Sequence, residues 1–157
     1  MARLLLIFIA SAFLIALSPA QNDFPNNPKN KWVHAAINAL KRDGLLPVWV
    51  TPATKSVKIS QRQKFASVTH GASYFIKYRI DRLHQLSAKP TSDTVEELEA
   101  LPKDIEKAQT WLVHLDNLEK MSKEFEPELK ASKLNAKKLR QDLQATKSKL
   151  AKLKAPA

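Results

Sequence analysis

Apolar side chains recur every three to four residues over most of the chain, which is the spacing of one face of a helix. The first such stripe consists of Trp32, Ala36, Ile37 and Leu40. Lys41 and Arg42 follow at its end, and Gly44 stands just beyond them. Basic residues in a last turn followed by glycine are typical of a helix C-terminus. The pattern therefore predicts a first helix that ends before Gly44.

A second and longer stripe begins after a stretch without helical periodicity. Residues 45–59 contain Pro47 and Pro52 together with β-branched residues, which favours a loop with at most a short strand. Ser60 or Gln61 then opens a helix that we expect to continue to about Ser87. Its apolar face consists of Phe65, Val68, Ala72, Phe75, Ile76, Ile80 and Leu83.

Two signals mark helix starts in the following segment. Asp93 with Glu96 has the spacing of a capping box, and Pro102 suits the first turn of a fresh helix after Leu101. A further stripe then consists of Ile105, Ala108, Leu112, Leu115, Leu118, Met121 and Phe125. We therefore expect one continuous helical face up to about Pro127.

Beyond Pro127 the apolar positions follow a heptad. Leu129, Ala136, Leu143 and Leu150 occupy position a, and Ser132, Leu139, Thr146 and Leu153 occupy position d. This pattern favours a coiled coil. Alternatively, Asn135 caps a new helix after a turn near Ser132. The fold class predicted is all-α: a short helix, a loop and a long helix over residues 21–88, then a helical hairpin or coiled coil over residues 92–154.

The chain begins with the features of a secretory signal peptide. Arg3 precedes an apolar run over residues 4–17, and Ser18-Pro19-Ala20 supplies the small residues of a cleavage site. A membrane anchor needs about 20 apolar residues, whereas this run has 14. We therefore expect cleavage after residue 20, export to the periplasm or cell envelope, and no membrane-spanning segment in the mature chain.

The net charge of +11 is distributed unevenly. Residues 21–91 carry +9, residues 92–128 carry −7 and residues 129–157 carry +8. For an exported protein, a basic balance favours anionic wall polymers or membrane surfaces as partners and argues against nucleic acid. The chain has no cysteine, which excludes disulfides and thiolate metal sites.

The residues with catalytic potential do not form a recognisable site. The four histidines are His34, His70, His84 and His114, and none has further ligands at the spacing of a metal site. Two glycines in the whole chain leave no phosphate-binding loop, and the carboxylates of residues 93–128 have the spacing of a solvated helix face. The sequence therefore predicts a non-enzymatic protein without a cofactor.

Residues 24–83 resemble an S-layer homology motif. The similarity lies in NNPKNKWVHAAI from Asn26, LKRDGLL from Leu40 and QRQKFA from Gln61. The matching positions are Pro28, Trp32, Ala36, Ile37, Leu40, Gly44, Leu45, Arg62, Phe65 and Ala66. Asn26 stands where the family has Asp, Gln61 replaces Thr and Lys64 replaces Glu. The glycine-containing loop of the family is replaced by residues 47–58, which contain no glycine.

The resemblance implies binding to an anionic, often pyruvylated polysaccharide attached to peptidoglycan. Trp32, Arg62 and Asn26 are the ligand-binding residues that it implies, whereas Gly44, Ile37 and Phe65 are structural. Arg62 would hold a carboxylate through its guanidinium fork, and Trp32 would offer an apolar face to a sugar ring. From the residues alone, Trp32 packing in the core against Phe65 and a solvated Arg62 remain open.

A second resemblance concerns the assembly. Residues 118–129 and Leu139 are similar to the helical segment that follows a single S-layer homology motif in some outer-membrane porins. This similarity implies a homotrimer joined by a coiled-coil spacer, although a dimer or an intrachain hairpin stays open. The expected function is that of an exported wall-binding protein with a spacer. The alternatives are a periplasmic holdase chaperone with basic helical arms, and a binder of anionic lipid that uses residues 129–157.

Overall fold

The computed structural model describes residues 31–47, 60–88 and 95–153, which form six helices and no strand. The prediction of an all-α fold is therefore confirmed. The helices are α1 (Lys31–Arg42), α2 (Gln61–Ala88), α3 (Val95–Gln109), α4 (Leu112–Glu124), α5 (Glu126–Ala131) and α6 (Ala136–Lys152). The predicted signal peptide, Asn26 and most of the predicted loop over residues 45–59 lie outside the described residues.

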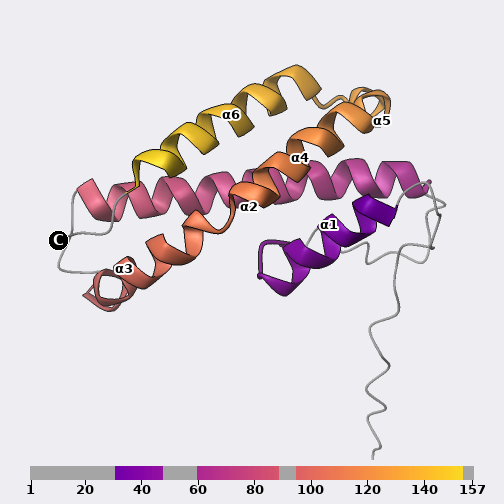
Figure 1. Cartoon of the computed structure of the whole chain (residues 1–157). Helices are drawn as coiled ribbons and strands as arrows, with labels where there is room; N and C mark the ends of the chain where they lie inside the picture. The colour runs from indigo at the N-terminus through magenta and orange to yellow at the C-terminus, as the bar shows by residue number, and fades with distance from the viewer. Residues whose placement is uncertain (1–30, 48–59, 89–94, 154–157) are drawn as a thin grey trace, which may run out of the picture.

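Helix α2 is the long central element, and the other helices pack along it (Figure 1). Helix α4 runs antiparallel to α2, since Arg62 contacts Glu124 whereas Arg79 lies over the ring of Trp111. Helix α6 returns beside both, and α1 packs on α4 and α2. One buried cluster extends from Val33 to Leu153. The described parts of the two predicted segments, 21–88 and 92–154, therefore share one hydrophobic core.

The C-terminus of α1 agrees with the prediction. Gly44 has φ +68°, its N–H donates to the carbonyl of Lys41 (3.1 Å), and the N–H of Leu45 donates to the carbonyl of Leu40 (2.8 Å). This is the Schellman arrangement, in which glycine adopts the left-handed conformation without a side-chain penalty. The left-handed backbone at Gly44 is therefore the physical reason for its predicted structural role.

The apolar face of α1 differs from the prediction at its first position. Val33, Ala36, Ile37 and Leu40 are buried, whereas Trp32 is 41% exposed. Val33 takes the core position because 33, 36, 37 and 40 follow the helical repeat more closely than the stripe that starts at Trp32. The interpretation that Trp32 packs in the core against Phe65 is therefore wrong. Phe65 instead contacts Phe125, with ring centroids 5.3 Å apart.

Helix α2 begins with a reciprocal cap. The Ser60 hydroxyl accepts from the N–H of Gln63 (3.2 Å), and the Gln63 side-chain oxygen accepts from the N–H of Ser60 (3.0 Å). The predicted stripe is buried except for Phe75, which is half-buried. Ala66, Thr69 and Ser73 are buried as well, because neighbouring helices cover α2 on more than one side.

The segment around Pro102 corrects two predictions. Pro102 lies inside α3 and does not open a new helix. The helix is interrupted at Thr110 and Trp111 instead, between α3 and α4. This interruption shifts the helical phase, so that Trp111 is buried and Leu112 is 49% exposed. A continuous stripe through Leu112 was therefore a wrong prediction, although Ile105 and Leu115 occupy the core as expected.

The heptad region forms a hairpin, not one continuous coiled-coil helix. Lys133 adopts φ 58° at the end of α5, and the Asn135 side chain caps α6 by accepting from the N–H of Lys138 (2.9 Å). The apolar a and d residues from Leu139 to Leu150 are buried inside the chain, where α6 packs on α2 and α4. The seam that favoured an inter-chain coiled coil is thus covered by the chain's own helices.

Candidate functional site

A shallow groove lies between α1 and α4, with a volume of about 420 Å³. Its lining consists of Trp32, Ala35, Ala36 and Ala39 from α1, and Asn117 and Lys120 from α4. The groove is open to solvent. We name it the Trp32 groove.

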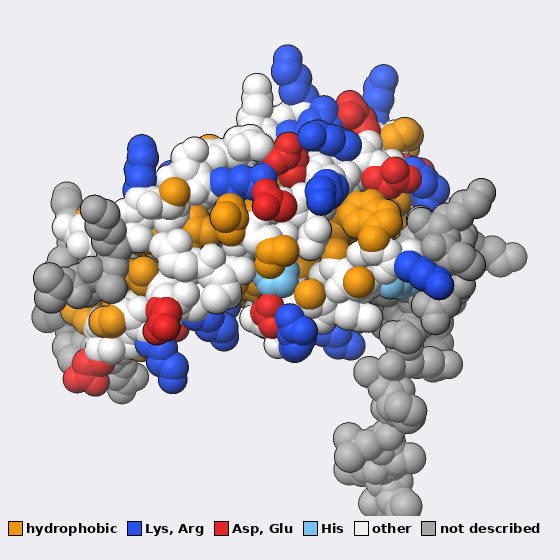
Figure 2. Space-filling model, in the orientation of Figure 1, with side chains coloured by type: hydrophobic (Ala, Val, Ile, Leu, Met, Phe, Trp, Pro, Cys, Tyr) orange, Lys and Arg blue, Asp and Glu red, His pale blue; other side chains and the backbone are white. Residues whose placement is uncertain are grey.

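The sequence of α1 explains why a groove forms here. The alanines at positions 35, 36 and 39 have short side chains, so the surface between the two helices is not filled. Trp32 stands at the N-terminal end of α1, and Asn117 and Lys120 lie one turn apart on α4. In Figure 2 hydrophobic side chains border this part of α1, with Lys and Arg side chains beside them.

The groove combines three chemical groups on one surface. The half-exposed indole of Trp32 offers an apolar face, the Asn117 amide can both donate and accept hydrogen bonds, and Lys120 carries a positive charge. Lys120 is exposed and has no ion-pair partner among the residues described. An aromatic face beside an amide and an ammonium group suits a sugar ring with an acidic substituent.

Arg62 does not line the Trp32 groove. Its guanidinium forms ion pairs with two carboxylates of the chain. It donates to the Oε1 atom of Glu128, to the Oε1 atom of Glu124 (3.0 Å) and to the backbone carbonyl of Glu124 (2.8 Å). The guanidinium also lies 5.0 Å from the centre of the Phe125 ring. This guanidinium lowers the pKa of the Glu128 carboxyl through its hydrogen bond. Arg62 therefore fastens the start of α2 to the α4–α5 junction.

A buried histidine contacts the residue that follows the C-terminal end of α1. The His114 side chain is 3% exposed, and its Nε2 atom lies 2.7 Å from Oδ2 of Asp43. The pKa of Asp43 is lowered, first by its hydrogen bond to Arg42 and then by that to His114. Since Asp43 directly follows α1 and His114 lies in α4, this pair holds together the two helices that line the Trp32 groove.

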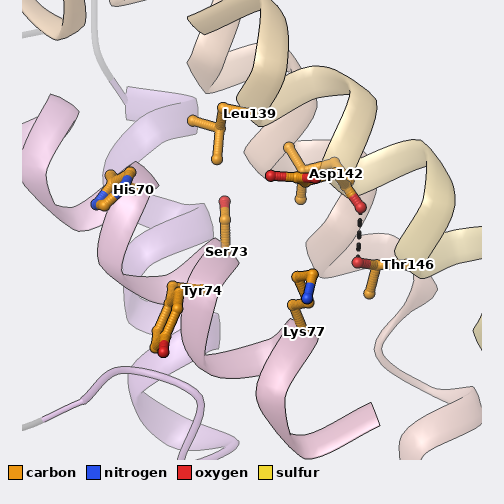
Figure 3. Close-up of a pocket in the computed structure, with 8 residues that line it drawn as sticks. His70, Ser73, Tyr74, Lys77, Leu139, Asp142 and Thr146 are labelled. Carbon is orange, nitrogen blue, oxygen red and sulfur yellow. Dashed lines mark hydrogen bonds between the residues drawn. The ribbon is translucent and has the colours of Figure 1, made fainter. Parts of the chain in front are cut away.

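A second depression lies between α2 and α6 (Figure 3). Its lining includes His70, Ser73 and Lys77 from α2 and Asp142 and Thr146 from α6, and it encloses about 30 Å³. The hydroxyls of Ser73 and Thr146 donate to carbonyls of their own helices, at 2.6 and 2.7 Å. The space suffices for a water molecule and is too small for a sugar or a peptide.

The remaining histidines are used in packing and hydrogen bonding. The ring of His34 meets that of Phe65 edge to face, with centroids 5.3 Å apart, and Nε2 of His84 lies 2.9 Å from the carbonyl of Lys149. Within the described ranges, no group of three His, Asp or Glu side chains is close enough to hold a metal ion. None of the helices in those ranges has the length and apolar character of a membrane span.

The structure therefore separates the site residues that the sequence predicted. Trp32 lines the groove, whereas Ile37 and Phe65 lie in the core as the structural assignment expected. The sequence reasoning missed Asn117 and Lys120, because they stand on the polar face of a helix far from the motif. Their only signal is that they lie on the same side of α4, three residues apart.

No family profile, curated protein sequence or solved structure matches this chain. The resemblance to the S-layer homology family therefore stays a prediction.

Proposed function

We propose that this protein is an exported, non-enzymatic component of the cell envelope that binds an anionic polysaccharide attached to peptidoglycan. The binding site is the Trp32 groove. The apolar leader over residues 4–17 supports export, and the resemblance of residues 24–83 supports the class of ligand.

The observation that carries the proposal is the exposure of Trp32 beside Lys120 and Asn117. Leaving an indole half in water forgoes part of the free energy that its burial would contribute to folding. Val33, the neighbouring residue, is fully buried, so the register of α1 turns Trp32 toward the groove. A sugar ring stacked on the indole would recover that burial, and its acidic group would reach the Lys120 ammonium.

The roles of the two cations differ from those that the resemblance implies. In this proposal Lys120 pairs with the carboxylate of the ligand, whereas Arg62 pairs with Glu124 and Glu128 and supports the fold. A homotrimer stays a prediction. It requires a contact surface other than the heptad seam, because that seam is buried within one chain.

Co-sedimentation with isolated cell-wall sacculi tests the proposal. Residues 21–157 contain the whole described fold and are the material for the assay. They should pellet with sacculi that retain their anionic polymers and stay in solution with sacculi stripped of them. Trp32→Ala should weaken the retention at least about tenfold, since stacking and apolar burial of an indole contribute roughly 1.5 kcal/mol or more. Lys120→Gln should weaken it and reduce its dependence on salt.

Tyr78→Ala is the matched control, because Tyr78 is an exposed aromatic residue on α2 that lies outside the groove lining. It should bind as the unmodified chain does. Equal retention of the Trp32→Ala and Tyr78→Ala variants would contradict the proposed site. If the chain does not pellet with polymer-bearing sacculi but prevents aggregation of an unfolded barrel protein, the holdase alternative replaces the proposal.

A further inference from the structure

A cluster of lysines covers the turn between α5 and α6. Lys130, Lys133, Lys137 and Lys138 fall within nine residues, and all four side chains are exposed. Lys and Arg side chains project from this end of the molecule in Figure 2. We name these four residues the lysine corner.

Two acidic residues near the lysine corner pair with arginines, not with the corner lysines. Glu126 pairs with Arg140 (2.9 Å), and Glu128 pairs with Arg62. Further along α6, Lys147 pairs with Asp116 and Glu119, whereas the four corner lysines have no ion pair with any described residue. The corner lysines are therefore not neutralised by direct ion pairs, in contrast to Lys147 in the middle of the same helix.

The shape of the corner distinguishes it from the Trp32 groove. Its residues line neither the Trp32 groove nor the depression of Figure 3, and the large exposed apolar side chains lie elsewhere, at Trp32, Tyr74, Tyr78, Leu112 and Val113. The corner therefore offers no exposed aromatic ring on which a sugar could stack. Lysines on flexible stems, projecting from a turn, match a surface that offers many negative charges without fixed geometry.

We propose that the lysine corner binds the phosphate headgroups of an anionic lipid bilayer. The attraction is electrostatic and acts at the membrane surface. Each lysine near an anionic surface strengthens the binding of the protein about fivefold. Four such lysines together contribute on the order of several hundredfold. The proposal is independent of the polysaccharide site, since it uses a different surface and a different ligand.

The test uses residues 21–157 and sedimentation with two kinds of vesicle: phosphatidylcholine mixed with phosphatidylglycerol, and phosphatidylcholine alone. We expect binding to the mixed vesicles only, weakening as salt is raised. A variant with all four corner lysines changed to glutamine should lose on the order of a hundredfold or more in partitioning. Circular dichroism and thermal melting confirm that each variant is folded.

The matched control removes the same charge from dispersed positions. Its four substitutions are Lys31→Gln, Lys41→Gln, Lys103→Gln and Lys152→Gln, on α1, α3 and α6, all at exposed lysines without an ion pair to a described residue. It should lose less than about tenfold, because scattered charges do not face one surface together. Equal losses in the two variants, or equal binding to both kinds of vesicle, would overturn the proposal. The proposal would also be overturned if the chain did not bind vesicles and instead bound a soluble anionic polymer through the corner lysines.

Trp32→Ala keeps the two proposals distinguishable. This variant should bind mixed vesicles as the unmodified chain does, although it loses retention on sacculi. The corner variant should show the reverse pattern at moderate salt. If both variants lose both activities, one shared surface is responsible and the assignment of the corner to lipid is wrong.

Discussion

Replacement of Arg62 by methionine should destabilise the fold and leave ligand binding intact. Methionine retains an apolar stem over Phe125 but cannot donate to Glu124 or Glu128. The Glu128 side chain is 17% exposed, so its charge would lose the partner that compensates its partial burial. Hydrogen bonds to charged groups contribute about 1.5–3 kcal/mol each. Because the Arg62 side chain is 42% exposed, solvent screening reduces this value, and we expect a net loss of about 1–2 kcal/mol.

Urea unfolding of residues 21–157, followed by circular dichroism, measures the effect. Lys64→Met is the matched control: it removes the same charge two residues further along α2, at a side chain without an ion pair to a described residue. It should change the free energy of unfolding by less than about 0.5 kcal/mol. Glu128→Gln in the Arg62→Met background should recover part of the loss, since the partly buried side chain at position 128 then carries no charge.

If Arg62→Met is as stable as Lys64→Met but no longer binds sacculi, Arg62 is a ligand-binding residue, as the family resemblance implies. The contacts with Glu124 and Glu128 would then be replaced by the ligand, and the site would have to include the start of α2.

Two further predictions follow from backbone conformation and from charge. Lys133→Gly should stabilise the protein by about 0.5–1 kcal/mol, because φ 58° is a left-handed conformation that penalises a side chain. Ala145→Gly, at an exposed position in the interior of α6, should destabilise it by about 1 kcal/mol; thermal melting compares the two variants, and equal signs would contradict the assignment. The pKa values of Glu119 and Glu128 are lowered, chiefly by hydrogen bonds from Lys147 and Arg62 respectively, so their stabilisation is present above the unfolded-state value of about 4.3 and is lost as pH falls through the folded values; urea midpoints should therefore drop below about pH 4, and midpoints independent of pH in that range would contradict the ion pairs.

Helix positions followed from the sequence where local signals agree with packing. The stop of α1 at Gly44 and the start of α2 at Ser60 each depend on residues within one turn, so the pattern was sufficient. Pro102 was misassigned because proline is typical of a first turn, although the surrounding helix tolerates it in α3. The interruption between α3 and α4 at Thr110 contains no proline or glycine, so the sequence has no local signal for it. Its position becomes clear only from the structure, in which Trp111 is buried.

The hairpin of α5 and α6 shows a limit of periodicity. A 3–4 repeat states that one face of a helix is buried but does not identify the partner, so packing on α2 within the chain and pairing with a second chain give the same heptad. The Asn135 cap was the local signal that favoured the hairpin, and its bond to Lys138 is present.

The candidate site could be predicted only in part. Trp32 was singled out from the sequence, but its exposure depends on whether it or Val33 enters the core, and the two positions differ by one residue. Asn117 and Lys120 become site residues only because α4 crosses α1 at this level. The pairing of Arg62 with Glu128 joins positions 66 residues apart and has no local signature.

Two-dimensional NMR of the nitrogen-bound protons tests most directly whether the Trp32 groove binds an anionic wall polysaccharide. Trp32 has an indole N–H and Asn117 a side-chain amide, so both groove residues report on a ligand, whereas the indole of Trp111 is buried and serves as the internal reference. Titration with polymer released from the wall should shift the Trp32 and Asn117 signals together to saturation and leave that of Trp111 in place. Saturable binding that moves neither Trp32 nor Asn117, or no binding at all, would contradict the account.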